Sequence, residues 1–199
     1  TVTVEGTVSR AFGAYARLQD ESGPTGASGL VIRQTAGENS EAFQGDIAEG
    51  NIQPGTQLQV TGITSEFAGL FQLNNDDLSS YEILGQGGVP SPQVVSLTDL
   101  QAPDGEDYES ELIEVAGLSF PEASGTFESG TTYTAEGAGG TAFDFRVQDS
   151  SETGIIGAPI PEGSFTYQGV LGQFNSFVGG DEGYQLIPVR PSDGQGGPG

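Results

Sequence analysis

The sequence predicts an all-β protein divided into two similar halves. Of its 199 residues, 33 are glycine and 11 are proline, and this composition favours many short strands joined by tight turns. Apolar residues alternate with polar ones at Val2, Val4 and Val8, as expected for a strand with one buried face. No apolar run is long enough to span a bilayer, so we expect no membrane span.

An internal repeat indicates the two halves, because two copies of one unit place similar segments in the same order. A chain of this length accommodates two domains of about 90 residues each. We expect a first unit at 1–87, a proline-containing connector at 88–107, a second, diverged unit at 108–193 and a glycine- and proline-rich tail at 194–199. The corresponding segments are 4–6 and 115–117, 17–20 and 146–149, 60–63 and 167–170, and 72–73 and 185–186.

A short helix is expected in the first unit, between its third and fourth strands. Ser40 is a residue type that caps helix N-termini, and Phe43 and Ile47 are spaced to share one helix face. The predicted order of the first unit is therefore three strands, a helix and two further strands.

The second copy differs from the first in two spacings. Arg17 and Gly62 are 45 residues apart (62 − 17), whereas Arg146 and Gly169 are only 23 apart (169 − 146), so we expect the helix to be lost there. Conversely, Arg146 lies 29 residues past the glycine at 117 (146 − 117), against 11 for Arg17 in the first copy (17 − 6). This second difference predicts an insertion in the first hairpin of the second unit.

The order of elements, with glycines interrupting the strands, resembles the OB-fold, a five-stranded Greek-key barrel. More narrowly, segments 17–20, 29–31, 60–62 and 67–73 look like the tandem OB-like domains of bacterial extracellular proteins, which accompany secreted nucleases and lamin-tail domains. The resemblance implies two tandem OB-fold-like barrels, the first with its helix between strands 3 and 4, and an extracellular or cell-surface location. OB barrels host many unrelated roles, so the resemblance implies fold more than function.

The charge is strongly one-sided, because 28 acidic residues stand against five arginines and no lysine, for a net charge of −23. Such self-repulsion is tolerated when the charges are solvated or screened by salt. We interpret the acidic residues as a solubilising coat suited to a salty, halophilic or marine habitat. Thr1 is not an initiator methionine, which indicates a mature product or a fragment of a longer chain.

Residue inventory argues against an enzyme. The chain contains no histidine, cysteine or lysine, so it lacks the usual acid/base and nucleophilic side chains and any thiolate metal site. Chemistry by two carboxylates remains open, but the acids lie in predicted turns and on polar strand faces. We expect no catalytic residue.

Four acidic clusters have the oxygen ligands that calcium prefers, although none follows the 12-residue calcium-loop pattern. Asp and Asn also stabilise turns through bonds to their own backbone, and we prefer that interpretation. The best metal-ligand candidates are Asn75, Asp76 and Asp77, which makes calcium the candidate cofactor. The four clusters are 20–21, 74–77, 104–107 and 181–182.

Aromatic residues near predicted loops are candidate contacts for a ligand or partner, because OB barrels bind ligands through such loops and neighbouring strands. The five arginines are few and scattered in sequence, so nucleic acid is an unlikely partner. These rings also suit barrel ends or contacts with neighbouring domains. The candidates are Phe12, Tyr15, Phe67 and Phe71 in the first half, and Phe174, Phe177 and Tyr184 in the second.

Two functions fit these observations. The favoured one is a non-enzymatic extracellular structural module that associates with itself or with neighbouring surface domains, as a filament or surface subunit. Its first strand, from Thr1 to Val8, and its tail, from Asp193 to Gly199, are the expected association segments. The alternative is a ligand-binding accessory module of a secreted hydrolase, with an oligonucleotide or a glycan as ligand.

Overall fold

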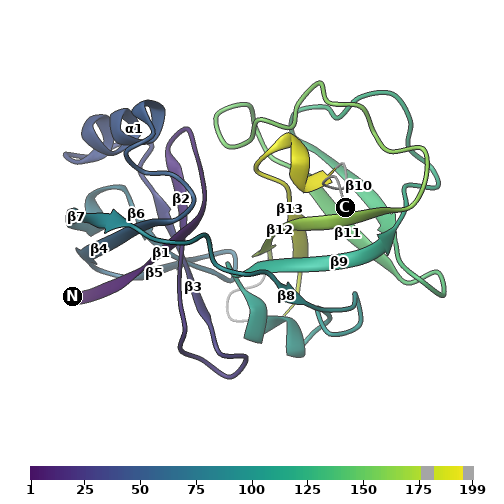
Figure 1. Cartoon of the computed structure of the whole chain (residues 1–199), viewed down its shortest axis with the longest axis horizontal. Coiled ribbons are helices and arrows are strands. Elements are labelled where there is room, and N and C mark those ends of the chain that lie inside the picture. The colour runs from purple at the N-terminus through teal and green to yellow at the C-terminus, as the bar shows by residue number, and fades with distance from the viewer. Residues whose placement is uncertain (176–181, 195–199) are drawn as a thin grey trace.

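The computed structural model describes residues 1–175 and 182–194 and is mostly β, as predicted (Figure 1). The strands form two mixed sheets, one from each half of the chain, and one short helix, α1 (Ser40–Glu49), packs against the core of the first half. The first sheet has the strand order β5-β6-β3-β2-β1-β4-β7. Its strands are β1 (Val2–Phe12), β2 (Tyr15–Asp20), β3 (Ser28–Arg33), β4 (Thr56–Gly62), β5 (Ser65–Phe67), β6 (Leu70–Asn74) and β7 (Leu78–Gln86).

The second sheet has the order β10-β11-β13-β12-β9-β8. Residues of the expected connector form β8, which pairs parallel with β9 and so belongs to this sheet. No helix within the described ranges is long and apolar enough to cross a membrane. Three 3₁₀ segments are Asn75–Asp77, Asp104–Tyr108 and Pro191–Gly194. The strands are β8 (Gln93–Val94), β9 (Leu112–Leu118), β10 (Thr131–Glu136), β11 (Ala142–Val147), β12 (Phe165–Gln173) and β13 (Tyr184–Ile187).

Most segments of the predicted repeat hold equivalent positions in the two sheets. Val4 pairs with Val60 between β1 and β4, and Val115 pairs with Tyr167 between β9 and β12. Residues 72–73 of β6 lie parallel to β3, and residues 185–186 of β13 lie parallel to β11. The similarity at these segments therefore reflects the same strand pairings in both halves.

One element of the repeat is wrong. Residues 17–20 end β2, which pairs antiparallel with both β1 and β3, whereas Arg146 lies on β11, which pairs antiparallel with β10 and parallel with β13. By its neighbours, β11 corresponds to β3. The predicted hairpin insertion is therefore also wrong, because the residues between Gly117 and Arg146 include the whole of β10. A four-residue similarity does not distinguish neighbouring strands that share the same alternation.

Helix α1 covers one side of the first core. Phe43 is fully buried and meets the ring of Tyr81 edge to face, with 5.2 Å between the ring centres. Ile47 packs on the same core, as the spacing predicted. The cap residue is Asn39 rather than Ser40, whose hydroxyl instead donates to the Gly37 carbonyl. In the second half, residues 148–164 between β11 and β12 form turns and bends. Five phenylalanines gather in the core of this half, Phe120, Phe127, Phe143, Phe145 and Phe165.

The two halves are joined by a buried ion pair. Arg10 of β1 lies 2.8 Å from Asp193, and both side chains are almost completely buried. The Arg10 guanidinium also donates to the backbone carbonyls of Ser9 and Gln168. Asp193 and Gly194, expected in or next to a linker-like tail, are therefore buried parts of the contact between the halves. The rest of that tail, residues 195–199, lies outside the described residues.

Other contacts extend this junction. The Gln19 side-chain oxygen accepts a hydrogen bond from the Leu112 N–H at 2.9 Å, and Glu109 accepts one from the Phe71 N–H at 3.0 Å. Phe12 is partly buried and packs against three residues of the second half, so it belongs to the junction. The three are Val170, Ile187 and Val189.

Candidate functional site

A pocket of about 500 Å³ lies between the two sheets. Strands β2, β3 and β6 of the first sheet and β11, β12 and β13 of the second supply much of its wall. Alternation along β2 explains the polar lining, since Ala16 and Leu18 point into the first core and Tyr15 and Arg17 therefore lie on the opposite face. The second half lies over that face, and the polar side chains line the space between the two sheets. We call it the inter-sheet pocket.

Cationic side chains are concentrated in the inter-sheet pocket. Arg17, Arg33 and Arg146 line it, which is three of the five arginines in the sequence. Asp149 and Glu152 are the acidic residues of the lining, so the formal local balance is +1 (3 − 2) in a protein of net charge −23. The site thus differs in sign from the rest of the molecule.

Arg17 is the most unusual of these residues. It is only 3% exposed, and its buried Nε has no hydrogen-bond partner. Within residues 1–175 and 182–194, no group accepts a hydrogen bond from its guanidinium or forms a salt bridge with it. Burial lowers the pKa of Arg17, and the nearby Glu152 and Tyr15 oppose that change. Guanidinium stays charged in proteins, so Arg17 is a buried cation without a bonded partner.

The other two arginines are already bonded. Arg33 donates from Nε to the Tyr15 hydroxyl at 3.0 Å and from Nη1 to the Asn74 side-chain oxygen at 2.7 Å. Its guanidinium also lies 5.9 Å from the centre of the Tyr15 ring. Arg146 donates from Nη1 to the Gly130 carbonyl at 2.6 Å. These bonds hold both side chains in place and leave Arg17 as the cation without a protein partner.

Glu152 and Tyr15 form the titratable wall of the pocket. Burial raises the pKa of Glu152, while the positive charge of Arg17 and a bond from Tyr15 act in the opposite direction. Burial, together with the charge of Glu152, also raises the pKa of Tyr15. The wall next to Arg17 therefore favours neutral side chains more than an exposed surface would.

Two exposed phenylalanines flank the pocket, one from each half. Phe67 of β5 is 63% exposed and Phe174, directly after β12, is 58% exposed. They occupy corresponding places in the repeat, five residues past Gly62 and Gly169 respectively (67 − 62, 174 − 169). Tyr15 is the third sequence-predicted contact residue in this site.

The remaining predicted contact residues lie elsewhere. Phe71 is 48% exposed but lines a separate, shallow hollow beside Val2 and Val4. Tyr184 is not a surface contact residue, because its ring is buried in the second core and its hydroxyl donates to Glu106 at 2.8 Å. Phe177 lies outside the described residues.

The metal candidates at 75–77 are occupied with loop contacts. The Asn75 side-chain oxygen accepts from the N–H groups of Thr35 and Ala36, and Asp76 accepts from the Glu38 N–H. Asp77 accepts from the hydroxyl of Ser65. In the part of the chain that the structure describes, no three acidic residues form a metal-binding group. The calcium site stays a prediction, and the observed bonds are those of turn residues.

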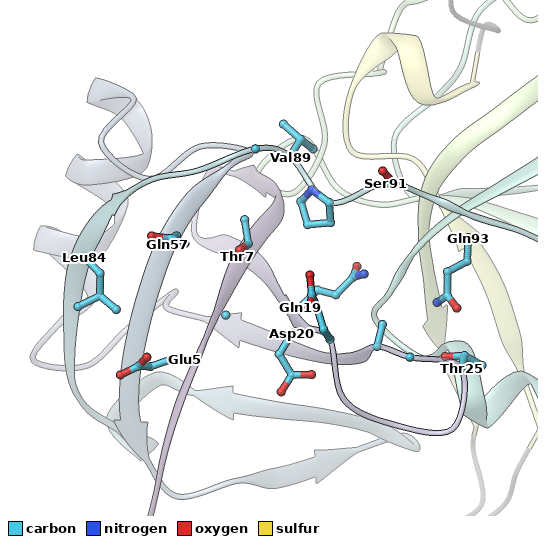
Figure 2. Close-up of a pocket in the computed structure, with 16 residues that line it drawn as sticks. Glu5, Thr7, Gln19, Asp20, Thr25, Gln57, Leu84, Val89, Ser91 and Gln93 are labelled. Carbon is cyan, nitrogen blue, oxygen red and sulfur yellow. The ribbon is translucent and has the colours of Figure 1, made fainter.

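A second, larger pocket of about 860 Å³ lies between the first sheet and the connector (Figure 2). Its charged lining residues are all acidic, namely Glu5, Asp20 and Glu21. Glu5 accepts a bond from Gln59, and Asp20 accepts bonds from Ser22. Two of the three carboxylates are therefore bonded locally. Among the described residues, no buried polar atom without a partner belongs to this lining, which distinguishes this pocket from the inter-sheet pocket.

Three of the seven aromatic residues predicted as contacts line the inter-sheet pocket, whereas its arginines were not among the predicted contact residues. Arg17 and Arg146 stand far apart in sequence, and only the packing of the halves brings them to one pocket. The similarity of segments 17–20 and 146–149 is no signal for this pocket, because the two segments lie on strands that are not equivalent. Comparison of the chain with models of protein families, with curated proteins and with solved structures finds no match.

Proposed function

We propose that the protein is a non-enzymatic binding module that holds a glycan in the inter-sheet pocket. The observation that carries this proposal is the pair of exposed rings, Phe67 and Phe174, on a pocket that both halves build. Aromatic faces in a polar pocket suit the apolar faces and hydroxyl edges of sugars. An extracellular or cell-surface location is part of the proposal, and the resemblance to extracellular OB-like modules supports it.

The charge distribution favours a glycan over an oligonucleotide. Binding of a nucleic-acid strand draws on a basic track that neutralises successive phosphates. Here Arg33 and Arg146 are engaged with protein acceptors, and the net charge of −23 repels a polyanion. The absence of histidine, cysteine and lysine from the sequence supports binding rather than catalysis.

We also propose that each half is an OB-like five-stranded Greek-key barrel. The first sheet contains the run β6-β3-β2-β1-β4, and the second contains β10-β11-β13-β12-β9. When the five strands of each run are numbered in chain order, the runs read 5-3-2-1-4 and 2-3-5-4-1. Both orders arise when the same closed ring of strands is opened, between strands 4 and 5 in the first half and between strands 1 and 2 in the second. A bridge between Ser119 and Glu136, with two hydrogen bonds of 2.9 Å, supports closure of the second ring.

Self-assembly as a surface or filament subunit is the second candidate function, and strand β7 favours it. This nine-residue strand ends the first sheet and pairs only with β4 among the described strands. Ile83 and Leu84 on it are exposed, and an open edge of this kind can add a strand from another chain. The first strand is less open, since residues 2–7 pair with β4 and 7–12 with β2.

A glycan array followed by isothermal titration of the best ligand tests the main proposal. We expect Phe67→Ala and Phe174→Ala each to weaken binding about tenfold, because loss of one stacking ring removes about 1–3 kcal/mol. Phe71→Ala is the matched control, since it removes an exposed ring from the same β5–β6 hairpin but outside the pocket.

Two results would contradict the proposal. One is the absence of any glycan ligand, and the other is a ligand whose affinity falls with Phe71→Ala but not with the two pocket variants. Light scattering of the same samples addresses the second candidate, because a strictly monomeric protein at all concentrations excludes assembly through β7.

A further inference from the structure

We infer that the ligand of the inter-sheet pocket carries a carboxylate, as a uronic-acid sugar does, and that Arg17 binds this carboxylate. The inference rests on the proposed glycan-binding function and names the chemistry of its ligand. It starts from Arg17, whose guanidinium is buried, lines the pocket and has no bonded partner among the described residues.

A buried cation without a bonded partner is a costly feature. Leaving one buried polar group unsatisfied costs about 1–3 kcal/mol, and more when the group is charged. The same structure contains Arg10, which is equally buried and fully paired, so the fold can satisfy an arginine at this junction. The unpaired state of Arg17 is therefore explained by an anion that arrives with the ligand.

The charges of the pocket lining indicate how many negative charges that anion carries. Arg33 and Arg146 donate to protein oxygens, while Asp149 and Glu152 add acidic groups to the lining. Among the residues that line the pocket, one positive charge is left to be compensated, which fits a single carboxylate and disfavours a phosphorylated or sulfated chain with several charges. A carboxylate is also planar and matches the guanidinium fork with two parallel hydrogen bonds.

The rest of the lining suits the sugar that would bear this group. Gln72 and Gln148 line the pocket, and no described residue forms a hydrogen bond with either side-chain amide. Each amide offers both a donor and an acceptor for a hydroxyl. With Phe67 and Phe174 at the rim, the pocket combines ring faces, hydroxyl partners and one cation, which are the parts that an acidic sugar uses.

The test compares a galactose oligosaccharide that carries one terminal galacturonic acid with the neutral galactose oligosaccharide of the same length and linkage, by isothermal titration at one fixed salt concentration. We expect the acidic oligosaccharide to bind at least tenfold more tightly, because a hydrogen bond to a charged group contributes about 1.5–3 kcal/mol. Arg17→Gln should remove this preference. Arg190→Gln is the charge-matched control, since Arg190 is exposed and absent from the pocket lining.

The outcomes separate the inference from the function on which it rests. Equal binding of both oligosaccharides, weakened by Phe67→Ala and unaffected by Arg17→Gln, overturns the inference and leaves glycan binding intact. Binding of neither oligosaccharide, nor of a series that carries one terminal glucuronic or mannuronic acid, overturns the inference, and failure of the whole glycan array overturns the function. Binding of a short oligothymidylate that depends on Arg17 overturns the carboxylate in favour of phosphate. The wild-type comparison decides the matter even if Arg17→Gln fails to fold.

Discussion

Arg10 and Arg17 face each other across the β1–β2 ladder, and their surroundings differ completely. Both are almost fully buried. Arg10 bonds to both oxygens of Asp193 and to two backbone carbonyls, whereas the guanidinium of Arg17 bonds to nothing among the described residues. Near Arg17, the Oε2 atom of Glu109 is also buried without a partner.

This contrast distinguishes two uses of a buried charge. A satisfied pair such as Arg10 and Asp193 fixes how two surfaces meet, because neither partner tolerates removal of the other. An unsatisfied group lowers stability and is retained where a ligand completes it. The junction around Arg10 therefore holds the halves together, and the pocket around Arg17 is the region where we propose that a ligand binds.

The largest expected effect on stability comes from breaking the ion pair between Arg10 and Asp193. Asp193→Ala leaves Arg10 buried and unpaired, and it also removes the acceptor of the Val189 and Arg190 N–H groups. We expect a loss of about 3–5 kcal/mol in the free energy of unfolding, measured by urea denaturation. The double variant Arg10→Met with Asp193→Ala should recover part of this loss. A loss below about 1 kcal/mol for the single variant would contradict the assignment of a structural role.

Stability should also depend on pH through the buried carboxyl groups, among them Glu109 near Arg17. Burial raises the pKa of Glu109 to about 7 and that of Glu111 to about 7, from an ordinary value of 4.5. A raised pKa means that the folded state binds more protons than the unfolded state. The stability from these groups is therefore fully present below about pH 4.5 and is lost as the pH rises through about 7.

We accordingly expect the melting temperature to fall between pH 5 and pH 8. The contribution of Glu109 to this change is a loss of at most about 3 kcal/mol in the free energy of unfolding. Glu109→Gln keeps an acceptor for the Phe71 N–H and should flatten the profile. Glu82→Gln, on the exposed strand β7, is the control for the general loss of one negative charge. A profile that rises with pH, or one that Glu109→Gln leaves unchanged, would show that this carboxyl is not the cause.

The sequence allows some of these features to be predicted and hides others for physical reasons. Alternation of apolar residues predicted strands, because side-chain period is a local property. The repeat matched segments 4–6 and 60–63 to 115–117 and 167–170, and these segments pair in the same way in the two sheets. Neither pattern could show that Arg17 and Arg146 share a pocket, since that depends on how two sheets pack. Polar residues on one face of a strand predict that this face is exposed to solvent. Here the second half of the chain covers that face of β2.

The function of the acidic clusters was also difficult to predict from the sequence. Asn75 and Asp76 have the right atoms for calcium, but a turn that binds its own backbone uses the same atoms. Sequence spacing does not separate these two uses when no 12-residue loop pattern is present. The hydrogen bonds of the folded chain are those of turn residues, and calcium binding stays a prediction.

The smallest expected effect is a gain in stability, in contrast to the loss expected for Asp193→Ala. Arg17→Met replaces an unpaired buried cation with an apolar side chain of similar length, so it removes a desolvated charge and leaves no donor unsatisfied. We expect a gain of about 1 kcal/mol at pH 5, or about 2–4 °C in the melting temperature. The gain should shrink at pH 8, because Arg17 lowers the pKa of both Glu109 and Glu152 and so stabilises their ionised forms. Differential scanning calorimetry at the two pH values measures both numbers. A loss of several degrees at pH 5 would mean that Arg17 is already satisfied within the fold, and it would remove the contrast with Arg10 on which the carboxylate site is argued.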